Sequence, residues 1–280
     1  MVSLRHESFA QLTPRRAKLA AFTGELPMWR GFIALLSVIL LASSAWAGQV
    51  IDTPILGSVD NFRDLAGIGA AYGGGTLDPA GRGYLRPGVA YRANALTLDS
   101  ADQAALAKLG IGEDIDLRTP AEIHRQPDQL PKGVVFVNVN ILGIQKLPPL
   151  DLSGAAGADE QMREAYRDFV TNPVERAGFR AALLDVAYAR TAIVFHCSAG
   201  KDRTGWMAVL LQSIAGVPQP IIRRDYLASD DYRAASIRAA LAKLPADERP
   251  GYAVMMGVQS DFLEAAFVPC DETMAACGDI

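Results

Sequence analysis

The sequence predicts a single α/β domain in which a mostly parallel sheet of four or five strands carries helices on both faces. Strand-like apolar runs alternate with stretches of helical periodicity along the chain, and half of the 280 residues are hydrophobic. One strand of the buried type, Thr191–Phe195, runs through a glycine-containing loop directly into a helix. Such a loop lies at the carboxyl end of a parallel strand, where α/β proteins place their sites.

The first elements of this domain alternate between turns, strands and a helix. Gly and Pro cluster over Gly67–Gly88, which indicates a turn-rich excursion or hairpin before a short strand at Val89–Arg92. A helix opened by an Asp or Ser cap is expected over Asp99–Leu109. Strands are expected at Gly112–Leu117 and Val134–Ile141, and the second is a nearly unbroken apolar run typical of a buried strand.

The second half of the chain is mainly helical. Helices are predicted over Glu160–Val170 and, after the Asn172-Pro173 break, over Val174–Tyr188. The stretches Asp225–Arg238 and Val258–Phe267 mix apolar and charged positions at helical spacing, as surface helices with one core face do.

The N-terminal region has the pattern of an export signal. Gly31–Ala47 holds no charged residue, and its apolar centre, Phe32–Ala42, has the length of a signal-peptide h-region. We expect cleavage after Ala47, with an uncleaved anchor as the alternative, and hence a periplasmic or secreted protein. A further Met at position 28 suggests that residues 1–27 are non-native or an extended n-region, that 28–47 is the signal peptide and that 48–280 is one domain.

Charge narrows the classes of function. The whole chain has 27 basic and 31 acidic residues, a net charge of −4. This composition excludes a disordered chain, a collagen-like repeat and a disulfide scaffold, and it argues against a nucleic-acid-binding protein. An anionic substrate must therefore be held by a local positive site.

The chemistry is expected in the decapeptide HCSAGKDRTG at residues 196–205, which is followed by the apolar helix Trp206–Ala215. A strand, a loop and a helix N-terminus in this order form a nest of backbone N–H groups that binds a tetrahedral oxyanion. Cys197 lies in the same field, so its pKa should fall and its thiolate should be a nucleophile at neutral pH. The other cysteines, Cys270 and Cys277, are expected to pair with each other in an oxidising compartment.

Side chains of the loop are expected to hold the phosphate. Arg203 can grip two phosphate oxygens as a bidentate fork, and the Thr204 hydroxyl can donate to the sulfur. His196 is expected to fix the loop, and Lys201 to add a second cation at the rim. The residues expected to bind substrate are His196, Ser198, Ala199, Gly200, Lys201 and Thr204.

This decapeptide resembles the signature of the cysteine-dependent protein tyrosine phosphatases, in the atypical bacterial tyrosine and dual-specificity branch whose loop reads HCxAGKDRT. Further segments resemble other motifs of that branch, although Ala66 and Ala93 replace its usual Gly and Ser. These segments are Asn61–Leu65 (NFRDL), Tyr91-Arg92, Asp116–Thr119 (DLRT) and Asp225–Leu227 (DYL). The resemblance implies a three-layer tyrosine-phosphatase fold, with C-terminal helices that form part of a lid over the site.

The resemblance also implies a two-step mechanism without metal or cofactor. Cys197 would attack phosphorus, Arg203 and the loop amides would stabilise the equatorial oxygens, and water would hydrolyse the phosphocysteine. The leaving oxygen needs a proton, yet the chain has no Trp-Pro-Asp motif to supply it. Asp202 is the first candidate for this acid and Asp116 the second; Asp202 could instead only orient Arg203.

Several alternatives stay open. Phosphotyrosine on a phosphorylated protein, or a small phosphomonoester, is the favoured substrate. A phospholipid or an inositol phosphate is the alternative, because Lys201 matches a lysine that lipid phosphatases carry in this loop, although Ser198 does not match their second lysine. A phosphate-binding module without turnover and a sulfurtransferase-like thiol enzyme are different classes that use a similar loop. Asn61, Arg63 and Asp64 could form a capped turn or brace the phosphate loop.

Overall fold

The computed structural model of the chain describes residues 55–67, 85–150, 152 and 154–272, which all lie within one compact unit, Ala47–Ile280. The expected export signal, most of the Gly- and Pro-rich segment and the expected cysteine pair lie outside the described residues or side chains. Among the helices of the described part, none combines the length and the apolar character that a bilayer span requires.

The core of the domain is a five-stranded sheet in the order β1-β2-β5-β3-β4. All neighbouring pairs are parallel except β1 with β2, which is antiparallel. The strands are β1 Arg63–Asp64, β2 Ala90–Ala93, β3 Ile111–Asp116, β4 Val135–Asn138 and β5 Ala192–His196. The expected mostly parallel sheet is thus confirmed, and β5, which leads into the loop at residues 197–202, is its central strand.

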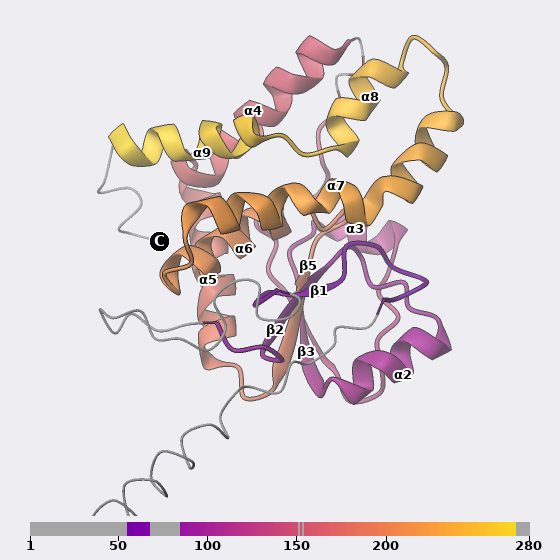
Figure 1. Cartoon of the computed structure of the whole chain (residues 1–280), viewed down its shortest axis with the longest axis vertical. Coiled ribbons are helices and arrows are strands. Elements are labelled where there is room, and N and C mark those ends of the chain that lie inside the picture. Colours follow the sequence, from indigo (N-terminus) through magenta and orange to yellow (C-terminus); the bar gives the residue numbers. More distant parts are fainter. Residues whose placement is uncertain (1–54, 68–84, 151, 153, 273–280) are drawn as a thin grey trace, which may run out of the picture. The chain divides into compact units, whose positions relative to one another are not determined.

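Helices cover both faces of this sheet and form the outer two layers of the fold. The helices α2 (Ser100–Lys108) and α3 (Pro120–Arg125) lie on one side, and α5 (Pro173–Tyr188) and α6 (Arg203–Ile214) lie on the other (Figure 1). Two clusters of buried apolar side chains fill the spaces between the layers.

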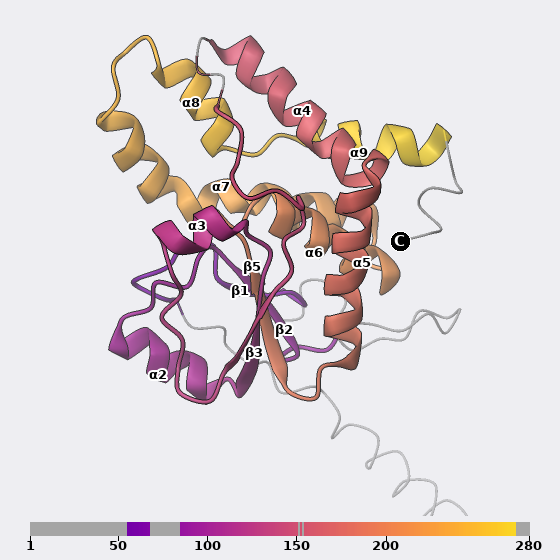
Figure 2. The ribbon, with the colours of Figure 1, turned by 180° about the vertical axis from the view of Figure 1, so that it is seen from behind.

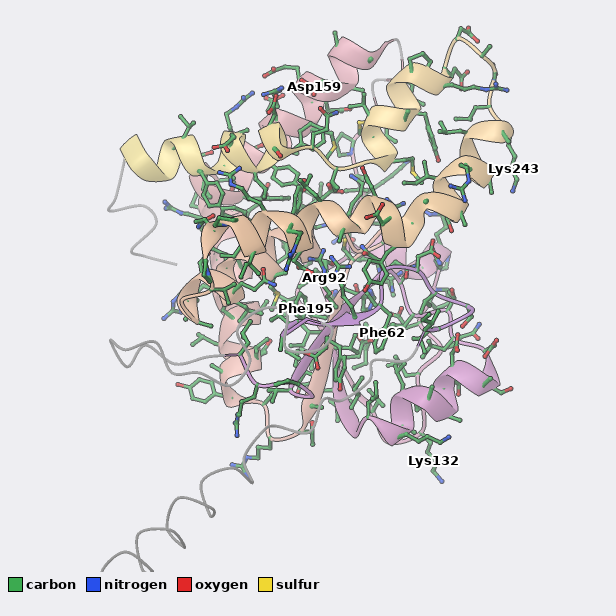
Figure 3. All side chains as sticks on the ribbon, in the orientation of Figure 1. Phe62, Arg92, Lys132, Asp159, Phe195 and Lys243 are labelled. Carbon is green, nitrogen blue, oxygen red and sulfur yellow. The ribbon has the colours of Figure 1, made fainter. Side chains whose placement is uncertain are left out.

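Side chains of the central strands point into these layers. Figure 3 shows Phe62, Arg92 and Phe195 among the packed elements, whereas the labelled charged residues Lys132, Asp159 and Lys243 lie at the periphery. Phe195 is fully buried, as expected for a strand paired on both edges.

A further group of helices gathers beyond the sheet, on the side of the loop at residues 197–202. The helices α4 (Ala155–Thr171), α8 (Arg249–Met256) and α9 (Ser260–Glu272) pack together, and the long α7 (Gln219–Ala242) passes beneath them in both Figures 1 and 2. Helix α4 contacts both α8 and α9. This group supplies one wall of the site described below.

The strand β4 corrects one expectation. The run Val134–Ile141 was expected to be a buried strand, yet β4 covers only its middle and is largely exposed. Val135 and Phe136 are 58% and 45% exposed. The reason is position, because β4 is the last strand of the sheet and pairs only with β3. Apolar composition does not distinguish such an edge strand from a central one.

Helix boundaries follow their caps. Asp99 caps α2 as expected, because its carboxylate accepts from the backbone N–H groups of Ala101 and Asp102. Asn172 caps α5 in the same way, with Pro173 in the first turn. The short helices α3 and α8 were not predicted, and α7 is longer than the predicted Asp225–Arg238.

Candidate active site

The loop at residues 197–202 joins the central strand β5 to the N-terminus of α6. Its backbone adopts a left-handed conformation at Gly200, which has a φ of +69°. A Cβ atom at this position would lie 2.3 Å from the carbonyl oxygen of Ala93. Glycine is therefore required here both by the left-handed backbone and by the close approach of β2.

A buried polar network braces this loop from behind. The carbonyl oxygen of Gly200 accepts from Asn61 Nδ2 at 2.8 Å and from an Arg92 guanidinium nitrogen at 2.9 Å. Arg92 and Arg63 in turn bind the two carboxylate oxygens of Asp225 at 2.9 and 2.7 Å. This network ties the loop to β1, β2 and α7, so a backbone carbonyl that would otherwise be buried without a partner is doubly satisfied.

The two interpretations of the Asn61 to Asp64 segment apply to different residues. Asn61 and Arg63 brace the loop, as described above. Asp64 instead caps a turn, because its carboxylate accepts from the backbone N–H groups of Ala66 at 2.8 Å and Gly88 at 2.6 Å.

Cys197 lies at the base of the loop and is 2% exposed. Burial by itself would raise the pKa of the thiol and the Asp202 carboxylate adds to this, but the Arg203 guanidinium and hydrogen bonds from the Thr204 hydroxyl and amide outweigh both and lower the pKa. The structure thus places a thiol with a lowered pKa at the base of the loop that the sequence predicts to bind an oxyanion.

Arg203 is held in place by Glu122, a residue of α3. Two guanidinium nitrogens of Arg203 bind the two carboxylate oxygens of Glu122 at 2.9 and 2.6 Å. Burial of Glu122 opposes its ionisation, but this pair and a 2.6 Å hydrogen bond from Ser198 lower its pKa to about 2. The same pair raises the pKa of Arg203 against the effect of its burial. Arg203 is therefore a permanent, oriented cation beside Cys197.

His196, which was expected to bind substrate and to fix the loop, is fully buried at the end of β5 and is not among the residues that line the cavity. Its Nδ1 lies 3.2 Å from the Cys197 carbonyl oxygen, and its Nε2 lies 3.2 Å from Asp114 Oδ1 and 3.6 Å from Asp128 Oδ2. Burial opposes protonation of the ring, but these carboxylates hold the pKa of His196 well above its ordinary value.

The three groups Asp114, Asp128 and His196 are close enough together to ligate a metal ion. Asp128, however, already pairs with the Arg118 guanidinium at 2.6 Å. A buried imidazolium between two carboxylates accounts for the cluster as an ion pair, so these residues do not require a metal.

The two aspartates considered as the general acid have different surroundings. Asp202 lines the cavity over the loop, and its Oδ1 accepts from Lys201 Nζ at 2.7 Å and from the Tyr166 hydroxyl at 3.1 Å. Asp116 is fully buried, forms an ion pair with Arg118 at 2.9 Å and is not among the cavity-lining residues. The location of Asp116 corrects its assignment as a candidate acid, because the carboxyl has no path to a substrate.

Lys201 also differs from expectation. We expected its ammonium group at the rim, but the side chain is 2% exposed and its nitrogen binds Asp202. Lys201 therefore organises the loop from inside and presents little free charge to solvent.

A cavity of about 460 Å³ opens over the loop. Cys197, Arg203 and the loop form its floor, and side chains of α4 and α8 contribute to its walls. Most of the lining is apolar. The apolar residues are Leu142, Ile144, Leu147, Pro148, Leu150, Met162, Ala165, Phe169, Tyr252, Met255 and Met256, with Ala199 in the loop.

With this geometry in place, comparison with known proteins is decisive. Residues 55–277 match the profile of a tyrosine phosphatase family. The chain belongs to this family. It is accordingly an enzyme of the protein-tyrosine-phosphatase type, a phosphoric monoester hydrolase.

Individual relatives agree with the family assignment of this phosphatase. A protein of Cupriavidus necator, whose name places it among the tyrosine-protein phosphatases, is 32% identical over 227 residues, with 78% of this chain and 76% of the relative covered. The triple specificity protein phosphatase PtpB of Mycobacterium tuberculosis is 28% identical over 263 residues, covering 78% of this chain and 88% of the relative. A tyrosine-protein phosphatase of Nostoc commune is 36% identical over 139 residues, or 48% of this chain and 46% of the relative.

Three residues of this phosphatase site were not predicted from the sequence. Glu122 and Glu175 line the cavity, and Tyr166 binds Asp202. A signal for Glu122 was present, because Thr119 and Glu122 have the T-x-x-E spacing of a capping box and form one at the start of α3. That pattern predicts a helix start, but not the contact with Arg203.

Proposed function

We propose that this phosphatase hydrolyses phosphotyrosine through a phosphocysteine intermediate on Cys197. The observation that carries the proposal is the position of this thiol, whose pKa is lowered, at the floor of a cavity beside an arginine already oriented by Glu122. Such a site is preorganised for a transferring phosphoryl group, because its charges need little rearrangement when the substrate arrives.

The proposed chemistry has two steps. In the first, Sγ of Cys197 attacks phosphorus, the bond from phosphorus to the tyrosine oxygen breaks, and Asp202 gives that oxygen its proton. Arg203 and the loop amides stabilise the equatorial oxygens. In the second, Asp202 accepts a proton from water as it attacks the phosphocysteine, which releases inorganic phosphate and the thiolate. The Thr204 bonds that stabilise the thiolate make sulfur a better leaving group.

The cavity supports an aromatic monophosphate as the substrate. Its walls are mostly apolar, and its two lining cations, Lys201 and Arg203, each pair with a carboxylate. The remaining charged lining residues are acidic, including Asp168 and Glu175. A second phosphate on a substrate would meet these acids, which disfavours phosphoinositides and inositol polyphosphates relative to phosphotyrosine.

Activity measurements on the full chain test this proposal. We expect turnover of p-nitrophenyl phosphate and of a phosphotyrosine peptide, loss of both in Cys197→Ser, and no sulfur transfer from thiosulfate to cyanide. A mass increase of one phosphoryl group on Cys197 after rapid acid quench would identify the intermediate. Faster turnover of a phosphoinositide than of the phosphotyrosine peptide would contradict the substrate assignment.

We also propose that the protein is exported through the segment 28–47, which has the composition of a signal peptide. Sequencing the N-termini of the precursor and the mature protein tests this. A mature protein that begins at Gly48 in a periplasmic or secreted fraction is expected, and a full-length chain in the cytosol would contradict it.

A further inference from the structure

The carboxyl group of Asp202 is held from one side by buried hydroxyl groups. The Tyr166 hydroxyl lies 3.1 Å from Asp202 Oδ1, and the Tyr226 hydroxyl lies 2.8 Å from that of Tyr166. Both tyrosines are fully buried, and they come from α4 and α7, outside the loop itself. Their rings meet edge to face, with centroids 6.2 Å apart.

The direction of this hydrogen-bond chain follows from the single proton that each tyrosine hydroxyl carries. Burial, followed by the Asp202 charge, holds the pKa values of Tyr166 and Tyr226 well above the ordinary value, so both hydroxyls keep their protons. Each hydroxyl has one proton to donate. Since Tyr166 donates to Asp202, Tyr226 donates to Tyr166, and the chain polarises toward the carboxylate.

The two oxygens of Asp202 are therefore not equivalent. Oδ1 accepts from Tyr166 and also from Lys201 Nζ at 2.7 Å. Oδ2 has no hydrogen-bond partner among the residues that the structure describes, and Asp202 lines the cavity. A proton on the carboxyl group would be placed on Oδ2, because Oδ1 is already occupied by two donors.

We propose that Tyr166 is a positioning residue for proton transfer: by holding Oδ1 together with Lys201, it makes Oδ2 of Asp202 the oxygen that delivers the proton to the leaving group. This inference rests on the proposed role of Asp202 as the general acid. Tyr166 does not touch the substrate phosphate site itself; it acts through the Asp202 rotamer.

Neighbouring residues accommodate the rings of Tyr166 and Tyr226. Gly205, in the first turn of α6, leaves room for Tyr226, since a Cβ atom there would lie 3.2 Å from its ring. Tyr166 is on α4 between Met162 and Phe169, which line the cavity. One helix therefore positions both the apolar wall and the acid.

The test compares leaving groups in Tyr166→Phe, which removes one hydroxyl and keeps the ring. Tyrosine, with a pKa of about 10, leaves poorly without a proton, whereas p-nitrophenolate leaves well. We expect kcat/KM for phosphotyrosine to fall about tenfold more than kcat/KM for p-nitrophenyl phosphate. Tyr188→Phe, at a position 79% exposed, is the matched control and should change neither value.

A double mutant separates this inference from the role of Asp202. In an Asp202→Asn background, Tyr166→Phe should have no further selective effect on phosphotyrosine, because the acid through which it acts is absent. A selective effect that persists there, equal losses for both substrates in Tyr166→Phe, or no loss at all would overturn the proposal. If Asp202→Asn alone shows no selectivity for the leaving group, the general acid assignment fails first, and this inference fails with it.

Tyr226→Phe provides a second variant, because it removes only the polarising hydroxyl. A loss of about two- to threefold, confined to phosphotyrosine, is expected. Thermal unfolding of each variant shows whether it folds. If one of the two Tyr→Phe variants does not fold, the leaving-group selectivity of the other tests the proposal. Absence of leaving-group selectivity in that variant would also overturn the proposal.

Discussion

Replacing Glu175 with Gln should stabilise the protein at alkaline pH and not at acidic pH. Glu175 is in the first turn of α5, is 6% exposed, and its Oε2 has no hydrogen-bond partner among the described residues. Burial, and then the nearby Asp168 carboxylate, raise the pKa of Glu175 from its ordinary 4.5 to about 7. The charge of Arg203 only partly opposes this rise.

The direction and size of the change in stability follow from the pKa values of Glu175 in the unfolded and the folded chain. Below about pH 4.5 the carboxyl is protonated in both folded and unfolded chains, so it adds no pH dependence. Between about pH 4.5 and 7 the unfolded chain ionises first, and the folded state loses stability until both are ionised. The difference in pKa corresponds to about 3.4 kcal/mol, which screening by solvent in the open cavity reduces to about 1–2 kcal/mol.

Urea unfolding at about pH 4.5 and about pH 8 measures this free energy. Glu175→Gln should equal the wild type at the lower pH and exceed it by about 1–2 kcal/mol at the higher pH. The control Glu164→Gln changes an exposed glutamate on α4 and should show no such pH-dependent gain. A gain for Glu175→Gln that is equal at both pH values, or a destabilisation at about pH 8, would refute the reasoning.

Four further variants, in three experiments, test other parts of the structure. Glu122→Gln should lower kcat/KM for p-nitrophenyl phosphate about 10- to 100-fold, since Arg203 loses its bidentate partner, while a wild-type rate would contradict this role. Gly200→Ala should lower the free energy of unfolding by more than about 1 kcal/mol, because φ is positive at this position and the new Cβ would meet a backbone carbonyl. The same variant should bind inorganic phosphate more weakly in calorimetry, and unchanged binding would count against the close approach. In urea unfolding, Phe136→Ala should cost only about 1 kcal/mol and Phe195→Ala about 3–5 kcal/mol, and similar costs would mean that β4 is not an exposed edge.

The features that could be predicted from the sequence are those that depend only on residues adjacent in the chain. The strand β5, the loop and the start of α6 follow one another directly, so the position of Cys197 and Arg203 could be derived from local pattern. Helix caps such as Asp99 are equally local.

Features that depend on distant contacts could not be derived in this way. Glu122 reaches Arg203 across 81 positions of the chain, and Tyr166 reaches Asp202 across 36. Burial of Asp116 depends on the pairing of β3 with both β4 and β5, which brings Asn138 and His196 beside it, so its burial could not be derived from its position at the end of a strand. The exposure of Phe136 depends on strand order, which apolar composition does not encode.

The brace behind Gly200 has a consequence for when the thiol becomes reactive. The hydrogen bonds from Asn61 and Arg92 to this carbonyl join residues 139 and 108 positions apart, and the bond from Arg63 to Asp225 spans 162. Contacts of such high sequence separation require the chain to close long loops, which costs conformational entropy and slows folding. A partly folded chain lacks this brace, so we expect the thiol to become reactive, and prone to oxidation, when the loop that carries Arg203 and Thr204 is held in its final shape.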